Sequence, residues 1–344
     1  MAEVRLQGLG KRYGDIQALQ GLDVTVASGE FLVLLGSSGA GKTTTLRLIA
    51  GLEKPDAGQV FLNGQDATSW HPAQRDLAFV FQQFSLYPHY TVRENLAFPL
   101  RAPGRKIPAA EIERRIQEVA GLLRIGHKLG NKATQLSGGE MQRVAIGRAL
   151  VRQPKVLLMD EPMSSLDAKL REELRGELKR IQARLGATIL YVTHDQVEAT
   201  TLADRIGILE QGRLVQLATP RAIYDDPGTL GVAQRLGSPP INVLAPEWCA
   251  EGEVPAGTKH LGIRPEDVRL GAVSGNGAAP LGQAVVEWTE RLGAQLQVVL
   301  RGTHGELRAL AATGSGLTRG QEVLVTLPHD KRLFFGSSGE RIRS

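Results

Sequence analysis

One junction between an apolar run and a glycine-rich run constrains this chain more than any other feature. Residues Phe31–Leu35 are continuously apolar, which predicts a strand buried on both faces, as in a parallel sheet. The run Gly36-Ser-Ser-Gly-Ala-Gly-Lys42-Thr43 follows directly, and from Gly41 a helical pattern continues until Gly51. A strand, a glycine-rich loop and a helix start in this order predict an α/β fold with a phosphate-binding loop.

This loop offers each kind of group that a nucleotide triphosphate requires. Its backbone N–H groups and the positive helix end hold phosphates, while Lys42 reaches the β- and γ-phosphates and the Thr43 hydroxyl is placed to bind Mg²⁺. A Gly/Ser turn without a ligand is the alternative, but glycine, lysine and hydroxyl all fall in register. The predicted nucleotide contacts are Gly36, Ser37, Ser38, Gly39, Ala40, Gly41, Lys42, Thr43 and Thr44.

Three further apolar runs also end in polar residues. Residues 77–81 precede Gln82, residues 156–159 precede Asp160 and Glu161, and residues 189–192 precede Thr193 and His194. In open parallel sheets, ligands bind beyond the carboxyl ends of the strands. A sheet made of all four strands would therefore gather these polar side chains and Lys42 at one edge.

The gathered side chains match what phosphoryl transfer needs, which is mostly positioning and charge stabilisation. Asp160 is predicted to hold the Mg²⁺ shell with Thr43, and Gln82 to span metal and water. Glu161 is predicted to polarise the attacking water as a general base. His194 is predicted to donate a hydrogen bond to the γ-phosphate. The alternatives are a solvated acidic turn and a structural histidine, and the phosphate loop and the companion residues argue against them.

A second polar run, Leu136-Ser-Gly-Gly-Glu140, opens another predicted helix. Ser137 and Glu140 form a capping box, and Asp195 with Glu198 forms a second candidate. Capping does not explain Gly138 and Gly139, because each glycine in a helix costs about 1 kcal/mol relative to alanine. We therefore expect a ligand to approach this backbone closely. Since one nucleotide needs only one cradle, two cradles predict a nucleotide clamped between two copies of the chain.

These motifs together resemble the ATP-binding subunit of an ABC transporter. The run Leu136-Ser-Gly-Gly-Glu140 is similar to that family's signature sequence. The run Val156-Leu-Leu-Met-Asp-Glu-Pro162 resembles its Walker B segment. Ser164-Ser-Leu-Asp167 resembles the D-loop, Gln82 the Q-loop glutamine and His194 the switch histidine. The resemblance implies ATP hydrolysis with Mg²⁺ in a head-to-tail homodimer. It also implies nucleotide contacts by Tyr13, Gln82, Ser137, Gly138, Gly139 and Asp167, with Tyr13 stacking on adenine.

One position departs from the family pattern, which more often has glutamine where this chain has Glu140. A carboxylate near a triphosphate is unfavourable unless it turns away. The capping box allows this, since Glu140 can accept a hydrogen bond from the Ser137 backbone N–H.

The sequence changes character near Gly237-Ser-Pro-Pro240. Short strand-like runs follow at 261–263, 284–288, 296–300, 322–327 and 333–335, which predict a small β-barrel or sandwich. Leu261-Gly-Ile-Arg-Pro-Glu266 and His329-Asp-Lys-Arg-Leu-Phe334 resemble the OB-like (TOBE) regulatory domain of importer ATPases for sugars, sulfate and polyamines. We therefore expect an ABC ATP-binding domain over 1–236, with a helical subdomain near 86–152, and a TOBE domain over 237–344.

Composition limits where the chain works. Its 344 residues hold 41 basic and 36 acidic residues, a small excess without the aromatic and basic surface of a nucleic-acid binder. The single cysteine excludes an internal disulfide. Because no signal peptide and no apolar run of roughly 18 residues is found, we expect a peripheral protein on the cytoplasmic face of the membrane. The resemblance implies transmembrane permease subunits as partners and, indirectly, an extracytoplasmic solute-binding protein.

Three other functions fit the sequence less well. A soluble ABC ATPase of repair or translation typically has two cassettes or a coiled-coil insertion, which this chain lacks. A GTPase would need Asn-Lys-x-Asp, whereas Asn131-Lys-Ala-Thr134 has no aspartate. A regulator without turnover is disfavoured by Lys42, Asp160, Glu161 and His194. The predicted function is thus an ATPase that powers solute import, with a sugar or sulfate as cargo.

Overall fold

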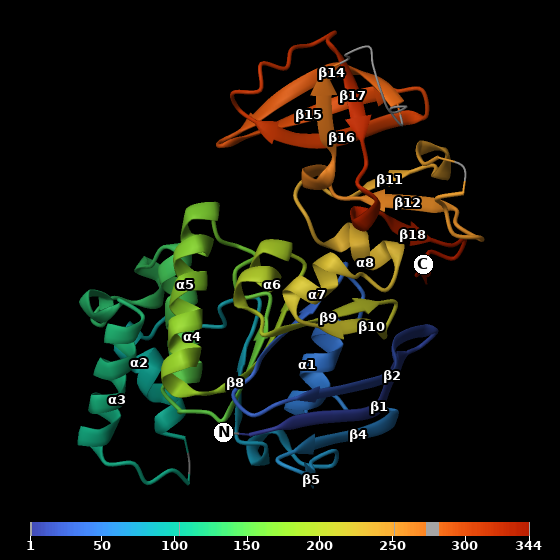
Figure 1. The fold of residues 1–344 in the computed structure, drawn as a ribbon. Helices are drawn as coiled ribbons and strands as arrows, with labels where there is room; N and C mark the ends of the chain where they lie inside the picture. The colour runs from blue at the N-terminus through green and yellow to red at the C-terminus, as the bar shows by residue number, and fades with distance from the viewer. Residues whose placement is uncertain (1, 103, 251, 273–281, 344) are drawn as a thin grey trace. The chain divides into compact units, whose positions relative to one another are not determined.

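The computed structural model describes residues 2–102, 104–250, 252–272 and 282–343, and Figure 1 shows its fold. The chain forms two compact units, Met1–Pro220 and Arg221–Ser344. The boundary between the two compact units therefore lies before the domain boundary that the sequence predicts at residue 236. The division into functional domains over 1–236 and 237–344 stays a prediction. None of the described helices is both long and apolar enough to cross a membrane.

A six-stranded sheet forms the centre of the first unit, in the order β10-β9-β3-β8-β7-β6. Its strands are β3 (Phe31–Leu35), β6 (Leu77–Val80), β7 (Val156–Asp160), β8 (Thr188–Thr193), β9 (Arg205–Glu210) and β10 (Arg213–Ala218). All neighbours pair in parallel except β10, which is antiparallel to β9. The prediction that four apolar runs share one parallel sheet is confirmed, and β9 joins them beside β3.

Strand register aligns the ends that carry polar residues. Leu35 pairs with Thr193, Asp160 with Val192, and Val80 with Met159. Every residue of β3, β7 and β8 is buried, which explains their nearly continuous apolar sequence. The phosphate loop and the ends of β7 and β8 therefore lie at the same edge of the sheet.

A second sheet in this unit has the order β2-β1-β4-β5. Its strands are β1 (Val4–Tyr13), β2 (Ile16–Val26), β4 (Ala57–Leu62) and β5 (Gln65–Asp66). One apolar cluster joins the two sheets, since it includes Val4 and Val60 from this sheet and Leu32 and Leu158 from the central one. Tyr13 ends β1 opposite Ile16.

The helices of the first unit are α1 (Lys42–Ala50), α2 (Val92–Ala97), α3 (Ala109–Leu122), α4 (Gly138–Leu150), α5 (Ala168–Leu185) and α6 (Gln196–Leu202). Helices α2, α3 and α4 occupy the stretch predicted to be helical, and Figure 1 shows them together on one side of this unit. The buried face of α3 contains Ile112, Ile116, Val119 and Ala120, as its helical period predicts.

The second unit contains α8 (Leu230–Arg235) and two antiparallel sheets, and α7 (Pro220–Asp225) lies at its start. One sheet has the order β11-β12-β18-β19, with β11 (Asn242–Leu244), β12 (His260–Ile263), β18 (Leu333–Phe335) and β19 (Arg341–Ile342). The other has the order β13-β17-β14-β15-β16, with β13 (Arg269–Ala272), β14 (Gly282–Leu292), β15 (Gln295–Gly302), β16 (Gly305–Ala312) and β17 (Glu322–Thr326). The five predicted strand regions are confirmed, and β11, β13, β16 and β19 are additions.

Arg264 explains why α8 belongs with the second unit. It is only 4% exposed, and its guanidinium donates hydrogen bonds to the carbonyls of Ala233 and Tyr224, both at 3.0 Å. It also lies over the Tyr224 ring, 3.9 Å from the ring centroid. A buried guanidinium that satisfies these helix carbonyls fixes the helical segment to the strand region that begins with β12.

Candidate functional site

Only glycine fits at the two ends of the glycine-rich loop. A Cβ atom on Gly36 would lie 2.5 Å from the Leu209 carbonyl oxygen, and one on Gly41 would lie 2.5 Å from that of Ala18. Gly41 also has φ of 101° and is the N-cap of α1. Ser37, Ser38 and Gly39 between them are exposed. The loop thus forms a turn with open backbone in front of a helix N-terminus, which fits bound phosphate groups.

Lys42 lies inside this loop. Its Nζ donates 3.0 Å hydrogen bonds to the carbonyls of Gly36 and Ser37, and it lies 3.6 Å from Oε1 of Glu161. The lysine is 5% exposed. A buried ammonium group needs such partners to offset the cost of burial. The two carbonyls and the Glu161 carboxylate therefore stabilise the Lys42 charge inside the loop, where phosphates would bind.

Thr43 and Asp160 form an oxygen-rich pair beside the loop. The Thr43 hydroxyl donates a 2.8 Å hydrogen bond to Oδ1 of Asp160, which is 6% exposed. Burial raises the pKa of the Asp160 carboxyl, although the Thr43 hydrogen bond opposes this shift. Hydroxyl and carboxylate oxygens are donors that suit Mg²⁺, which usually takes its other ligands from phosphates and water. Within the described residues no cluster of three or more His, Cys, Asp or Glu suggests a metal held by protein alone.

Glu161 has an unusual backbone conformation. It has φ of 43°, in the left-handed region that non-glycine residues seldom adopt, and its N–H donates to the Val192 carbonyl at 3.0 Å. One carboxylate oxygen faces Lys42 and the other lies 3.1 Å from Nδ1 of His194. The backbone therefore directs this carboxylate between a cation and an imidazole whose side chain is 60% exposed.

One sequence prediction is wrong in the segment that follows His194. Asp195 caps α6 as expected, since its Oδ1 accepts hydrogen bonds from the N–H groups of Val197 and Glu198. Glu198, however, does not complete a capping box. Its carboxylate instead accepts hydrogen bonds from Tyr191 and Thr193, both at 2.7 Å. The prediction failed because two hydroxyls on β8 compete for that carboxylate.

The run at residues 137–139 begins α4 with the predicted capping box. Glu140 accepts a 2.9 Å hydrogen bond from the Ser137 N–H, and the Ser137 hydroxyl accepts one from the Glu140 N–H. Lys128 adds an ion pair of 3.1 Å to Glu140, which the sequence did not indicate. The hydrogen bond from the Ser137 backbone, helped by Lys128, lowers the pKa of the Glu140 carboxyl. The carboxylate thus turns back onto its own helix start.

The two glycines of this run have different environments. A Cβ on Gly138 would meet nothing within 4 Å, which leaves its backbone open to a ligand. A Cβ on Gly139 would lie 1.9 Å from Cδ2 of Leu170 on α5. Gly139 therefore also serves helix packing, because a methyl group there would displace the Leu170 side chain. Its predicted contact with a nucleotide stays a prediction.

The remaining predicted nucleotide contacts lie on separate elements. Gln82 is exposed just beyond β6, at the same sheet edge as Asp160. Tyr13 is 41% exposed at the end of β1, with Lys11 Nζ 5.3 Å from its ring centroid. Asp167 caps α5 by accepting a hydrogen bond from Leu170 N–H. Thr44 is partly buried in the first turn of α1, while Ala40 is buried in the loop.

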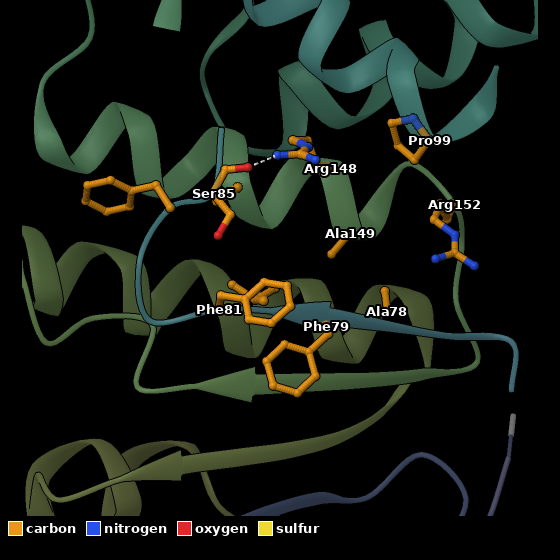
Figure 2. A pocket seen from close by; sticks show the side chains of 11 residues that line it. Ala78, Phe79, Phe81, Ser85, Pro99, Arg148, Ala149 and Arg152 are labelled. Atoms are coloured by element: carbon orange, nitrogen blue, oxygen red, sulfur yellow. Dashed lines mark hydrogen bonds between the residues drawn. The ribbon is translucent and has the colours of Figure 1, made fainter. Parts of the chain in front are cut away.

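A pocket of about 160 Å³ lies between β6 and α4, and Figure 2 shows its side chains. Arg148 of α4 donates to the Ser85 carbonyl and lies 4.7 Å from the Tyr87 ring centroid, while Arg152 lines the same pocket. A neighbouring apolar pocket of about 300 Å³ is lined by Gln83, Phe84, Ser85, Leu86, Pro88, Ala133, Thr134 and Met141. Sequence reasoning missed Arg148, whose contacts depend on a loop 63 residues away.

Comparison with known proteins gives two matching family models. The model described as ABC transporter matches residues 19–164, and the model described as TOBE domain matches residues 261–335. Among curated relatives, the trehalose/maltose import ATP-binding protein MalK of Thermococcus litoralis is 45% identical over 88% of both chains. The sn-glycerol-3-phosphate import ATP-binding protein UgpC of Rhodopseudomonas palustris is 42% identical over 99% of both chains.

Solved structures resemble the first part of the chain. The dimeric structure of MJ0796, a bacterial ABC transporter cassette, has a TM-score of 0.58 and 33% identity, and it covers 63% of this chain and 99% of that one. A dimeric post-hydrolysis state of the same cassette, bound to ADP and Pi, has a TM-score of 0.57 and 32% identity, with the same coverage.

Proposed function

Because the chain belongs to the family of ABC transporter ATP-binding subunits that serve importers, we propose that Glu161 and His194 carry out the ATP hydrolysis that powers its solute import. The observation that carries this assignment is the position of the Glu161 carboxylate between Lys42 Nζ and His194 Nδ1. A strained backbone holds it there, and such strain is concentrated at functional sites.

Each residue then has a defined part in the reaction. Glu161 accepts a proton from the attacking water, whose oxygen bonds to the γ-phosphorus while the bond to the β–γ bridging oxygen breaks. Lys42 leaves its loop carbonyls to offset the charge on the β- and γ-phosphates, and His194 donates a hydrogen bond to the γ-phosphate. Thr43, Gln82 and Asp160 would hold Mg²⁺, which when bound offsets the negative charge of the phosphate oxygens.

The nucleotide is proposed to lie between two copies of the chain. The loop from Gly36 to Thr44 binds the phosphates, and Tyr13 stacks on adenine, which its exposed ring allows. Ser137, Gly138 and Gly139 come from the second copy, as does Asp167. The open backbone at Gly138 and the inward turn of Glu140 support this arrangement, because they leave the helix start free for an anion.

The general-base assignment is tested by Glu161→Gln. This variant keeps the shape of the side chain but cannot accept the proton, so we expect turnover to fall by roughly 10²–10⁴. ATP affinity should stay near that of the wild type, and ATP should trap a closed dimer, measured by size-exclusion chromatography. Near wild-type hydrolysis would remove Glu161 as the base.

The shared site is tested by mixing two inactive variants, Lys42→Ala and Ser137→Arg. In a mixed head-to-tail dimer, both defects fall in one site and the other site is intact. At equal amounts we expect about one quarter of wild-type turnover, since half of the dimers are mixed and each has one intact site of two. No recovery after mixing would contradict the shared site.

The import partners are permease subunits, and we place the chain on the cytoplasmic face of their membrane. The apolar pocket beside Phe84 and Leu86 supports docking of a short helix there, since a helix can lay an apolar face into such a groove. Tyr87, Tyr90 and Phe98 also pack on one another, so the aromatic residues contribute to the subdomain core as well. A solute-binding protein outside the membrane completes the proposed system.

For the cargo we propose a sugar or a glycerol phosphate, because one of the two curated relatives named above is described as a trehalose/maltose importer subunit and the other as an sn-glycerol-3-phosphate importer subunit. Reconstitution of the chain with its permease in vesicles would test this. Uptake of labelled maltose or glycerol 3-phosphate that requires internal ATP supports the proposal, and uptake of sulfate alone would contradict it.

A further inference from the structure

We propose that Asp195 is a positioning residue for His194 and that it ties this histidine to helix α5 through Arg171. The inference rests on the proposed function, since it requires His194 to act on the γ-phosphate. It is based on the different hydrogen-bond partners of the two carboxylate oxygens of Asp195.

The two carboxylate oxygens of Asp195 bind different elements. Oδ1 accepts hydrogen bonds of 2.7 Å from Val197 N–H and 3.3 Å from Glu198 N–H, which caps α6. Oδ2 accepts a 3.3 Å hydrogen bond from Nη1 of Arg171, in the first part of α5. Asp195 therefore connects the starts of two helices at the residue directly after His194.

The residue directly before His194 is held as well. The Thr193 hydroxyl donates to Glu198 at 2.7 Å and accepts from the Asp195 N–H at 3.0 Å. Glu198 is 2% exposed and is also bonded to the Tyr191 hydroxyl at 2.7 Å. With its neighbours fixed on both sides, His194 has little freedom except through its own side-chain torsions.

The ion pair with Arg171 connects His194 to the first turn of α5. Arg171 N–H donates to the carbonyl of Asp167, the residue that caps α5 and that is proposed to meet the second copy. A shift in the first turn of α5 is therefore passed to Asp195 through the ion pair, and then to His194. In this way contact with the second copy is coupled to the placement of a group near the γ-phosphate.

This link affects rate more than stability. The side chains of Arg171 and Asp195 are 34% and 22% exposed, and an ion pair this close to the surface contributes little to stability. Misplacing a catalytic group, by contrast, can reduce a rate by up to ~10²-fold. Loss of the pair should thus lower turnover in a protein that remains folded.

The Asp195→Asn variant tests the role of one carboxylate oxygen while the role of the other is kept. The amide oxygen of asparagine keeps the cap of α6, while its NH₂ group faces Arg171 and removes the ion pair. We expect kcat for ATP to fall about tenfold, with the Kd for ATP within about twofold of wild type and no change in Tm. The Arg171→Gln variant should show the same loss of kcat. The Arg171→Lys variant should retain most of the wild-type kcat, because lysine keeps the positive charge.

The double variant provides the decisive comparison. If the pair acts as one unit, Asp195→Asn with Arg171→Gln should be no slower than either single variant. Lys179→Gln is the matched control, since Lys179 lies on the same helix and forms a 3.0 Å ion pair with Asp204, away from the site. Its turnover should stay within about twofold of wild type.

Three results would overturn the proposal: normal kcat in both single variants, additive losses in the double variant, or an equal loss in the Lys179→Gln control. Glu161→Gln is measured alongside. If Glu161→Gln is inactive while Asp195→Asn is normal, only the positioning role fails. If Glu161→Gln hydrolyses ATP normally, the proposed function fails instead.

Discussion

The hydroxyl of Thr43 donates a 2.8 Å hydrogen bond to Asp160, a residue 117 positions further along the chain. This bond joins the phosphate loop directly to the end of β7. Two oxygen donors are thus already in place where Mg²⁺ is proposed to bind, so little rearrangement is needed when the metal arrives with ATP.

Removal of the Thr43 hydroxyl should weaken metal binding. We expect Thr43→Val to raise the Mg²⁺ concentration needed for half-maximal ATPase activity by about 10–100-fold. In the metal-free protein the pKa of Asp160 should also rise, because the Thr43 hydrogen bond that holds it down is lost. Thr43→Ser is the control and should retain both properties. A valine variant with unchanged Mg²⁺ dependence would contradict the proposed site.

Gly138 and Gly139 should respond differently to alanine. Gly139→Ala places a methyl group against Leu170, so we expect a loss of about 1–3 kcal/mol in unfolding free energy, measured with urea. Leu170→Ala should relieve this loss when combined with it. Gly138→Ala should leave stability unchanged or higher, yet lower ATPase activity, if a nucleotide approaches that backbone. Equal stability of the two alanine variants would refute the packing argument.

Glu140→Gln should retain ATPase activity within about twofold, since glutamine also completes a capping box. At pH 7 the unfolding free energy should fall by up to about 1 kcal/mol, because the ion pair with Lys128 is lost. The pKa of Glu140 is lowered in the folded protein, so its contribution is present above the ordinary value of 4.5 and disappears as the pH falls through the folded pKa. The two proteins should therefore converge in acid, and a collapse of turnover at pH 7 would show that the carboxylate itself is needed.

Glu198 should give the opposite pH dependence. Burial raises its pKa above the ordinary 4.5, so the folded protein binds more protons than the unfolded chain between the two values. Stability contributed by this group therefore falls as the pH rises through that window. Glu198→Gln cannot titrate, and we expect a flatter stability curve above about pH 4.5, measured by urea unfolding at several pH values. A curve as steep as that of the wild type would exclude Glu198 as the cause.

Local patterns in the sequence predicted much of the first unit. Continuous apolar runs predict buried parallel strands because both faces of β3, β7 and β8 are covered. The polar residues at their ends were correctly expected at one edge, since parallel strands share a direction. The Ser137–Glu140 capping box was equally predictable, because its partners are three residues apart.

Only the tertiary structure decided which side chains meet across long separations. Glu161 faces Lys42 and His194 because of strand order and a left-handed backbone, and neither is encoded in a local pattern. Gly139 is needed because Leu170 of another helix packs on it. By itself the sequence determined the elements and the chemical groups they carry, since these depend on neighbouring residues. The packing of those elements determined how the groups are paired, because side-chain contacts form only when distant segments are brought together.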